Sequence, residues 1–171
     1  MNEDAVLTEL QAIIHSPTIR SQLTGTLARV EGTLAASQDQ PQAWEPVPLE
    51  RFGPALPRAI KSCWVFVLRA NASFGAERHP NSHQRTVALR GSALFELYRD
   101  ANWSPMPIDA ASDDPMKGKW VSIPVSTWHR IKIGPKTLVS LSFHTVPANE
   151  LIEETPVAED MAVTRRRLYH A

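Results

Sequence analysis

The sequence lacks the features of secreted and membrane-spanning proteins. Its single cysteine, Cys63, has no partner for an internal disulfide. The first residues, MNEDAVLTEL, contain neither the basic stretch nor the apolar stretch of a secretory signal peptide. The longest apolar run is the short CWVFVL at 63–68, whereas about 20 apolar residues are needed to cross a bilayer. We therefore predict a soluble, cytoplasmic protein with no membrane partner.

An excess of charge of either sign is also lacking. Eighteen basic residues balance eighteen acidic ones, so no long-range field attracts nucleic acid. We predict a small-molecule substrate and no nucleic-acid partner. The chain of 171 residues, 43% of them hydrophobic, is long enough for one hydrophobic core. We therefore expect one domain with an appendage.

The first forty residues carry a helical pattern of apolar residues. Two series repeat at three- and four-residue spacing, namely Val6, Leu10 and Ile13, then Leu23, Leu27, Val30 and Leu34. Between them, Ser16 and Pro17 suit the N-cap and the first position of a second helix. Gly25 and Gly32 weaken that helix, so it needs a surface to pack against. A partner subunit is one such surface, and we predict a homodimer.

After residue 40 the pattern changes to that of β-strands. The stretch 38–57 holds five prolines, which exclude a helix and allow only edge-like strands or a linker. The runs that follow are rich in β-branched and aromatic residues, as in SCWVFVLRA, RTVALRGSALFELYR, KWVSIPV and KTLVSLSFHTV. Short strands without intervening helices favour an antiparallel sandwich or barrel.

We therefore predict a mainly β chain with three parts. Residues 1–40 form an N-terminal helical appendage, residues 41–150 the β-barrel, and residues 151–171 a polar tail. We expect this tail to be a surface helix or disordered. The stretch 101–119, which is long and rich in proline for a hairpin loop, is predicted to be a mobile lid.

The stretch FGAERHPNSHQRTVALRG at 74–91 concentrates possible metal ligands. Glu77 and His79 are two positions apart on an expected strand, so their side chains leave the same face. Residues 80–82 read as a turn, and a second strand leads to Gly91. A second segment, GKWVSIPVSTWH, begins with Gly118 and reaches His129.

These two segments resemble the two sequence motifs of the cupin superfamily of small β-barrels. The second motif has a glycine, then a proline six positions on, then a second glycine, a histidine and an asparagine. Gly118, Pro124 and His129 fall in place, while Ser126 and Ile133 replace the second glycine and the asparagine.

The first motif of that family consists of two histidines, a glutamate and a glycine. Counted back from Gly91, Gln84 occupies the glutamate position, and Glu77 and His79 occupy the two histidine positions. The resemblance covers roughly residues 60–147. It implies a single cupin barrel of the double-stranded β-helix type, which often binds a metal in its mouth.

The resemblance implies a metal site that contains Glu77, His79 and His129. Two imidazoles and a carboxylate bind Fe(II), Mn, Zn or Ni and leave coordination positions open. The fourth candidate is His83 or Gln84, which face opposite ways on a strand. Register favours Gln84, but ligand chemistry favours His83, and we predict His83 on the assumption of a bulge after the turn. A barrel that kept its shape without the metal is the alternative.

Three further residues are predicted to contact the substrate. Arg85 can bind a carboxylate through two hydrogen bonds, Trp128 precedes the motif histidine, and His144 lies on the more polar face of its strand. We predict a metal-binding enzyme that acts on a small organic acid or carbonyl compound. A non-haem iron dioxygenase is the leading interpretation. The alternatives are a metal-dependent sugar or keto-acid isomerase and a non-catalytic ligand-binding cupin.

Overall fold

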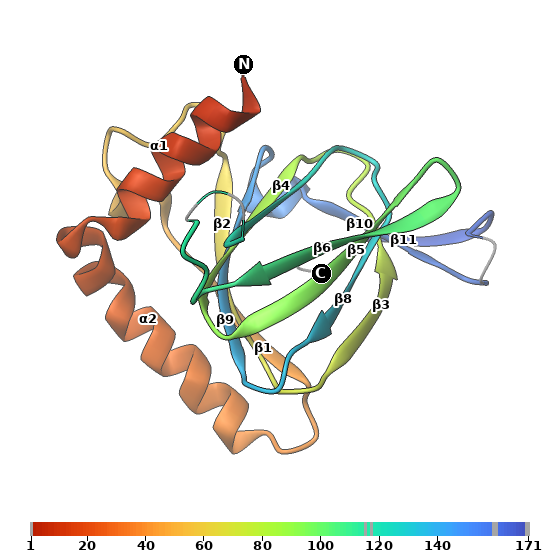
Figure 1. Cartoon of the computed structure of the whole chain (residues 1–171), viewed down its shortest axis with the longest axis horizontal. Helices are drawn as coiled ribbons and strands as arrows, with labels where there is room; N and C mark the ends of the chain where they lie inside the picture. The colour runs from red at the N-terminus through yellow and green to blue at the C-terminus, as the bar shows by residue number, and fades with distance from the viewer. Residues whose placement is uncertain (1, 115, 117, 159–160, 170–171) are drawn as a thin grey trace.

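Two antiparallel sheets face each other across a β-barrel, and two helices cover the outside of one sheet (Figure 1). The computed structural model describes residues 2–114, 116, 118–158 and 161–169. The larger sheet has the strand order β1 (Gln42–Pro46), β2 (Ser62–Leu68), β9 (Leu138–His144), β4 (Gln84–Arg90) and β7 (Trp120–Ile123). The smaller has the order β3 (Ser73–Glu77), β8 (His129–Ile133), β5 (Ser92–Arg99) and β6 (Asn102–Asp109). The predicted mainly β barrel with an N-terminal helical pair is confirmed.

The helices α1 (Glu3–His15) and α2 (Pro17–Ala36) contain the two predicted series of apolar residues. Pro17 occupies the first position of α2, although the Ser16 side chain makes no capping hydrogen bond. Both helices share one core cluster with the outer face of the larger sheet, in particular with Cys63, Val65, Val139, Leu141 and Phe143. The chain's own barrel therefore covers their apolar faces, and the homodimer stays a prediction. Neither helix is both long and apolar enough to span a membrane, and this holds for every helix in the described residues.

The proline-rich stretch contains the predicted edge strand, β1, at the margin of the larger sheet. It also contains a short 3-10 helix, Leu49–Phe52, which the proline count had led us to exclude. This turn buries Phe52 against Phe143, with ring centroids 5.3 Å apart. The prolines flank the turn and do not interrupt it, since Pro48 precedes its first residue.

The predicted lid is wrong for residues 102–109 of the stretch 101–119. Residues 102–109 form β6, which pairs with β5 in an unbroken register from Asn102 opposite Arg99 to Asp109 opposite Ser92. The strand lies at the margin of the smaller sheet, across that sheet from β3. Residues 115 and 117 of the predicted lid lie outside the described residues.

The tail was also predicted wrongly, because it forms a two-stranded hairpin of β10 (Ile152–Pro156) and β11 (Thr164–Leu168). The hairpin lies on the side of the barrel away from the helices (Figure 1). Acidic residues of β10 stand opposite basic residues of β11, with Glu153 paired to Arg167 and Glu154 to Arg166. Opposite charges on neighbouring strands stabilise a hairpin, so a segment that reads as a solvated tail folds.

Backbone hydrogen bonds attach this hairpin to the end of β3. The N–H of Arg78 donates to the carbonyl of Glu154, and the N–H of Glu154 donates back, both at 2.9 Å. The Arg78 guanidinium also pairs with the Glu154 carboxylate at 2.8 Å. Leu151, just before β10, is fully buried. The hairpin is therefore a fixed part of the barrel wall.

Two motif positions have the backbone conformation that favours glycine. Gly91 has φ +77°, and a Cβ atom there would lie 2.5 Å from the carbonyl oxygen of Thr137. Ser126, which stands where the cupin motif has its second glycine, has φ +61°. Its N–H donates to the carbonyl of His79 at 2.9 Å. The turn keeps the shape that glycine allows, although serine occupies it.

Candidate metal centre

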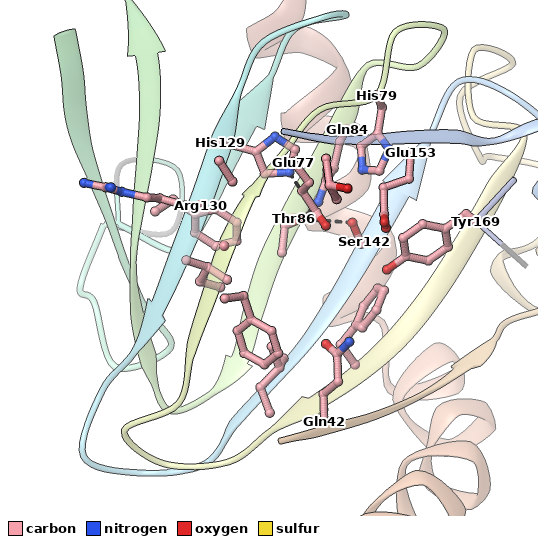
Figure 2. Close-up of a pocket in the computed structure, with 18 of the residues that line it drawn as sticks. Gln42, Glu77, His79, Gln84, Thr86, His129, Arg130, Ser142, Glu153 and Tyr169 are labelled. Carbon is pink, nitrogen blue, oxygen red and sulfur yellow. Dashed lines mark hydrogen bonds and ion pairs between the residues drawn. The ribbon is translucent and has the colours of Figure 1, made fainter. Parts of the chain in front are cut away.

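A cavity of about 610 Å³ lies inside the barrel between the two sheets and the C-terminal hairpin. Strands β1 to β5, β8 and β9 contribute side chains to its lining, and the hairpin segment adds others. Figure 2 shows Glu77, His79, Gln84 and His129 gathered at one end and Gln42 at the other. A cavity of this size suits a small-molecule ligand.

Glu77, His79 and His129 converge at the first of these ends. Each offers one ligand atom, and these atoms lie within 4.8 Å of one another. Glu77 ends β3 and His129 begins β8, and the two are direct partners in the strand register. His79 follows two residues after Glu77, so its side chain returns to the same face, as the sequence predicted. Both histidines are buried, with exposed fractions of 4% and 2%.

Backbone carbonyls fix the orientation of both imidazole rings. His79 Nδ1 lies 3.0 Å from the carbonyl oxygen of Ile152, and His129 Nδ1 lies 3.1 Å from that of Thr127. Because a carbonyl oxygen can only accept, each Nδ1 carries a proton, and in the neutral form of each ring Nε2 then carries the lone pair. His129 Nε2 is buried without a hydrogen-bond partner in the described part of the chain. It lies 3.3 Å from Glu77 Oε1, a contact at ion-pair distance without hydrogen-bond geometry.

The electrostatics of the site favour a neutral His79 beside an ionised Glu77 carboxylate. Burial lowers the pKa of His79, against the opposing effect of Glu77. For Glu77, burial acts to raise the pKa, but the neighbouring His129, with His79 and Arg167, outweighs it and holds the pKa below its usual value. A neutral imidazole and an ionised carboxylate are the forms that bind a metal.

Of the two candidates for a fourth ligand, Gln84 faces the cavity and His83 does not, so the predicted orientation of His83 was wrong. Gln84 is buried and lines the cavity, where its Nε2 donates to Thr86 Oγ1 at 3.1 Å. His83 points to the opposite face, with Nε2 2.7 Å from Ser122 Oγ. The irregularity in the pairing of β4 comes near its far end, between Ala88 and Arg90, and not after the turn. Without a bulge at the turn, strand register decides.

Two of the three predicted substrate contacts lie elsewhere. Arg85 leaves the same face as His83 and binds Glu3 of α1 through two hydrogen bonds, of 2.8 and 2.6 Å. Trp128 is buried outside the cavity lining, with the Arg78 guanidinium 4.6 Å above its ring. The one-residue offset from His129 accounts for this, because neighbours on a strand face opposite ways.

His144 does line the cavity, as predicted. Its Nδ1 lies 3.3 Å from Ser82 Oγ, and its Nε2 lies 3.3 Å from Ser142 Oγ. Burial first, and then the neighbouring His79 and His129, place its pKa well below the usual value. His144 is therefore a neutral wall residue held by two hydroxyl groups.

The sequence prediction missed the part of the site that the hairpin supplies. Glu153, Arg167 and Tyr169 line the cavity from this segment, and Glu153 and Tyr169 face the histidine end in Figure 2. The Tyr169 ring lies 5.8 Å from the His79 ring and 5.7 Å from Trp64. Complementary charges in IEETP and TRRRL were the available signal for this hairpin.

Solved structures share this architecture, although no family profile and no curated protein matches the sequence. Pumpkin seed globulin is 17% identical over 68% of this chain, with a TM-score of 0.52, and coconut allergen cocosin is 16% identical over 68%, with 0.51. Both are cupin-fold proteins. The chain has the cupin fold. An oxalate oxidase bound to the substrate analogue glycolate aligns less well, at 10% identity over 64% of the chain and a TM-score of 0.49.

The likeness concerns the cupin barrel and not the whole of these proteins. The matched part spans 28% of the pumpkin globulin chain, 29% of cocosin and 53% of oxalate oxidase. At such identities the comparison shows the fold alone, because one fold hosts many functions. What this cupin does has to be argued from its own residues.

Proposed function

We propose that this cupin is a metal-dependent enzyme acting on a small organic acid or carbonyl compound, with Glu77, His79 and His129 as the metal ligands. One observation carries the proposal. Both imidazoles donate their Nδ1 proton to backbone carbonyls, and both lie beside the partly exposed Glu77 carboxylate, with ligand atoms within 4.8 Å of one another. Metal-binding histidines are oriented in this way, since the outer hydrogen bond fixes the tautomer.

The donor set also fits a metal on energetic grounds. A buried polar atom without a partner costs about 1 to 3 kcal/mol, and His129 Nε2 is such an atom among the described residues. A bound cation would satisfy this lone pair and the adjacent carboxylate together. Gln84 Oε1, also buried without a partner in the described residues, lies at the same end of the cavity.

Two histidines and one carboxylate are the ligand set of non-haem iron oxygenases, with positions left open. Iron and a dioxygenase reaction are therefore the leading proposal, with Mn, Ni or Zn as other metals. When bound, the metal would polarise a substrate oxygen or activate O₂. The chain's own residues hold the site: backbone carbonyls orient the imidazoles, and the hairpin with Tyr169 lines one side of the cavity.

Metal reconstitution tests this proposal. Purified protein is stripped, incubated with Fe(II), Mn(II), Ni(II) or Zn(II) and analysed for bound metal. We expect about one equivalent in the wild type and loss of most of it in His79→Ala and His129→Ala, because each removes one of few ligands. His83→Ala is the matched control, since its ring binds Ser122 outside the cavity. Equal metal in all three variants would refute the ligand assignment.

Oxygen uptake then separates the chemical alternatives. An iron dioxygenase consumes O₂ when Fe(II) and substrate are both present. A metal-dependent isomerase turns substrate over without oxygen, and a non-catalytic cupin binds its ligand without turnover. The oxygen electrode, combined with product analysis, distinguishes the three.

A further inference from the structure

The cavity changes from polar to apolar along the strands of the smaller sheet. Glu77 and His129 pair at the metal end. Two residues further along β8 comes Ile131, which pairs with Phe74 on one side and Phe95 on the other. Two residues of strand span about 7 Å, so this apolar layer begins about 7 Å from His129. Phe66 and Leu68 continue the apolar lining from the larger sheet.

The opposite wall is polar near the metal end, but its hydroxyl groups bond to one another. Gln84 Nε2 donates to Thr86 Oγ1, and Thr86 Oγ1 lies 2.9 Å from Ser142 Oγ. Ser142 in turn contacts His144 at 3.3 Å. Gln84 Oε1 is the exception, because it is buried without a partner among the described residues. It offers an acceptor to a ligand group that donates a hydrogen bond.

Cations are present at the cavity but are already paired. Arg130 binds Glu96 through two nitrogen atoms, at 2.8 and 3.1 Å, and stacks on Trp103. Figure 2 shows its guanidinium directed away from the cavity. Arg167 binds Glu153, with Nε at 2.8 Å and Nη2 at 2.7 Å. Within the described lining, every arginine thus has an acidic partner.

The charge balance limits the ligand. A divalent cation with the Glu77 carboxylate and two neutral histidines leaves one net positive charge at the site. A head group with one negative charge is matched there, whereas a dianion is left with an uncompensated charge in a cavity of low dielectric. With no spare arginine in the described lining, a second carboxylate or a phosphate has no partner.

We propose, on the basis of the metal-dependent function above, that the ligand is a two-oxygen chelator of at most one negative charge with an apolar or aromatic tail. Its head binds at Glu77, His79 and His129 and gives a hydrogen bond to Gln84 Oε1. Its tail lies in the layer formed by Phe74, Phe95 and Ile131. Dicarboxylates and sugar phosphates fall outside this class because of their charge, and free sugars because they have no apolar tail for this layer.

Four chelating probes test the proposal on the zinc- or cobalt-loaded full-length protein. Benzohydroxamic acid has a monoanionic head, an N–H donor and a ring. Acetohydroxamic acid lacks the ring, N-methylbenzohydroxamic acid lacks the N–H, and oxalate is a dianion without a tail. Binding is measured by calorimetry and by the visible absorption of the cobalt protein, so no catalytic activity is required.

In the wild type, benzohydroxamic acid should bind at least tenfold more tightly than acetohydroxamic acid and than oxalate. N-methylation should weaken it severalfold. Gln84→Leu should remove the difference between the methylated and unmethylated probes, because the acceptor is gone. Phe74→Ala should remove most of the preference for the ring, because Phe74 is only partly buried and its loss opens the apolar layer.

The outcomes distinguish this inference from the function on which it rests. Protein that takes up no metal refutes the proposed function and this inference together. Protein that binds metal but prefers oxalate, or that binds benzohydroxamic and acetohydroxamic acid equally, refutes the ligand class. The proposed metal function is unaffected by that result. The wild-type probe series decides this even if a variant fails to fold, which circular dichroism would reveal.

Discussion

His79 donates its Nδ1 proton to the carbonyl oxygen of Ile152, a residue 73 positions further along the chain. The candidate ligand is therefore aimed by the C-terminal hairpin and not by its own strand. Asn81 reinforces this link. Its Oδ1 accepts from the N–H of Ile152 at 3.1 Å, and its Nδ2 donates to the carbonyl of Glu150 at 2.7 Å.

We predict that Asn81→Ala weakens metal binding about tenfold, because groups that orient ligands typically contribute ten- to a hundredfold to affinity. The substitution removes both hydrogen bonds to the start of β10 without touching a ligand. Zinc titration against a competing chelator measures the effect. The matched control is Asn102→Ala, where the lost bond to the carbonyl of Asp100 lies in the β5–β6 turn. Equal affinity in both variants would contradict the link.

Metal removal should destabilise the protein. If free metal exceeds its dissociation constant a hundred- to a thousandfold, binding to the folded state adds about 3 to 4 kcal/mol to the free energy of unfolding. We expect the chelator EDTA to lower the melting temperature of the wild type. The His129→Ala variant should melt at one temperature with and without the chelator. A wild-type melting temperature insensitive to EDTA would speak against a bound metal.

We expect Arg85 to contribute to the stability of the fold and not to metal binding. Its buried guanidinium binds Glu3 on α1, so Arg85→Ala removes the arginine partner of that carboxylate and leaves it the hydrogen bond from Ser122. We predict a loss of about 2 to 3 kcal/mol, below the 3 to 5 of a fully buried pair because Glu3 is partly exposed. Urea unfolding measures this, and hydrogen exchange should rise first in α1. Unchanged stability, or loss of bound metal, would restore a role for Arg85 at the site.

The same ion pair should make helix α1 sensitive to acid. Burial acts to raise the pKa of Glu3, but the hydrogen bonds from Arg85 and Ser122 and the charge of Arg85 outweigh it and lower the pKa below its usual value. In the unfolded chain the pKa of a glutamate is about 4.3. A lower pKa in the folded protein stabilises the fold at pH values above about 4.3, and this stabilisation is lost as the pH falls through the folded-state pKa.

Glu3→Gln is the test of this pH dependence. The difference in unfolding free energy between the wild type and the variant should be constant from pH 7 to about pH 5. It should shrink between the unfolded and the folded pKa. The other carboxyl groups titrate alike in both proteins, so their contribution cancels in the difference in unfolding free energy. A difference that stays constant down to pH 3 would contradict the predicted linkage.

Replacing Ser126 with glycine should make the protein more stable. Its φ of +61° strains a residue with a β-carbon by about 1 to 2 kcal/mol, while glycine costs up to about 1 kcal/mol in backbone entropy. We therefore predict that Ser126→Gly raises the free energy of unfolding by about 0.5 to 1 kcal/mol. Ser126→Ala keeps the β-carbon and should bring no gain, and chemical denaturation of the three proteins would compare them.

Local patterns in the sequence were sufficient to predict the barrel, the helical pair and the meeting of Glu77, His79 and His129. Strand periodicity places Glu77 and His79 on one face, and the motif spacing identifies His129. The same periodicity also pointed to Gln84, and the prediction of the fourth ligand failed because we let ligand chemistry override strand register in favour of His83.

The failures at Arg85 and in the tail have a different cause. Nothing near Arg85 in the sequence shows that Glu3, 82 positions away, lies against it. The hairpin likewise depends on pairing between Glu153 and Arg167 and on attachment to Arg78. Such contacts between distant segments are set by tertiary packing, which local patterns do not report.

The dependence of His79 on Ile152 also sets an order of events during synthesis on the ribosome. Both sheets of the barrel are complete once the chain has passed His144, the last residue of β9. At that moment His79 lacks the carbonyl that orients it, because Ile152 and the hairpin that follows are still inside the exit tunnel. If the proposed metal binds, its capture with full affinity has to wait until residues 152–169 have left the tunnel.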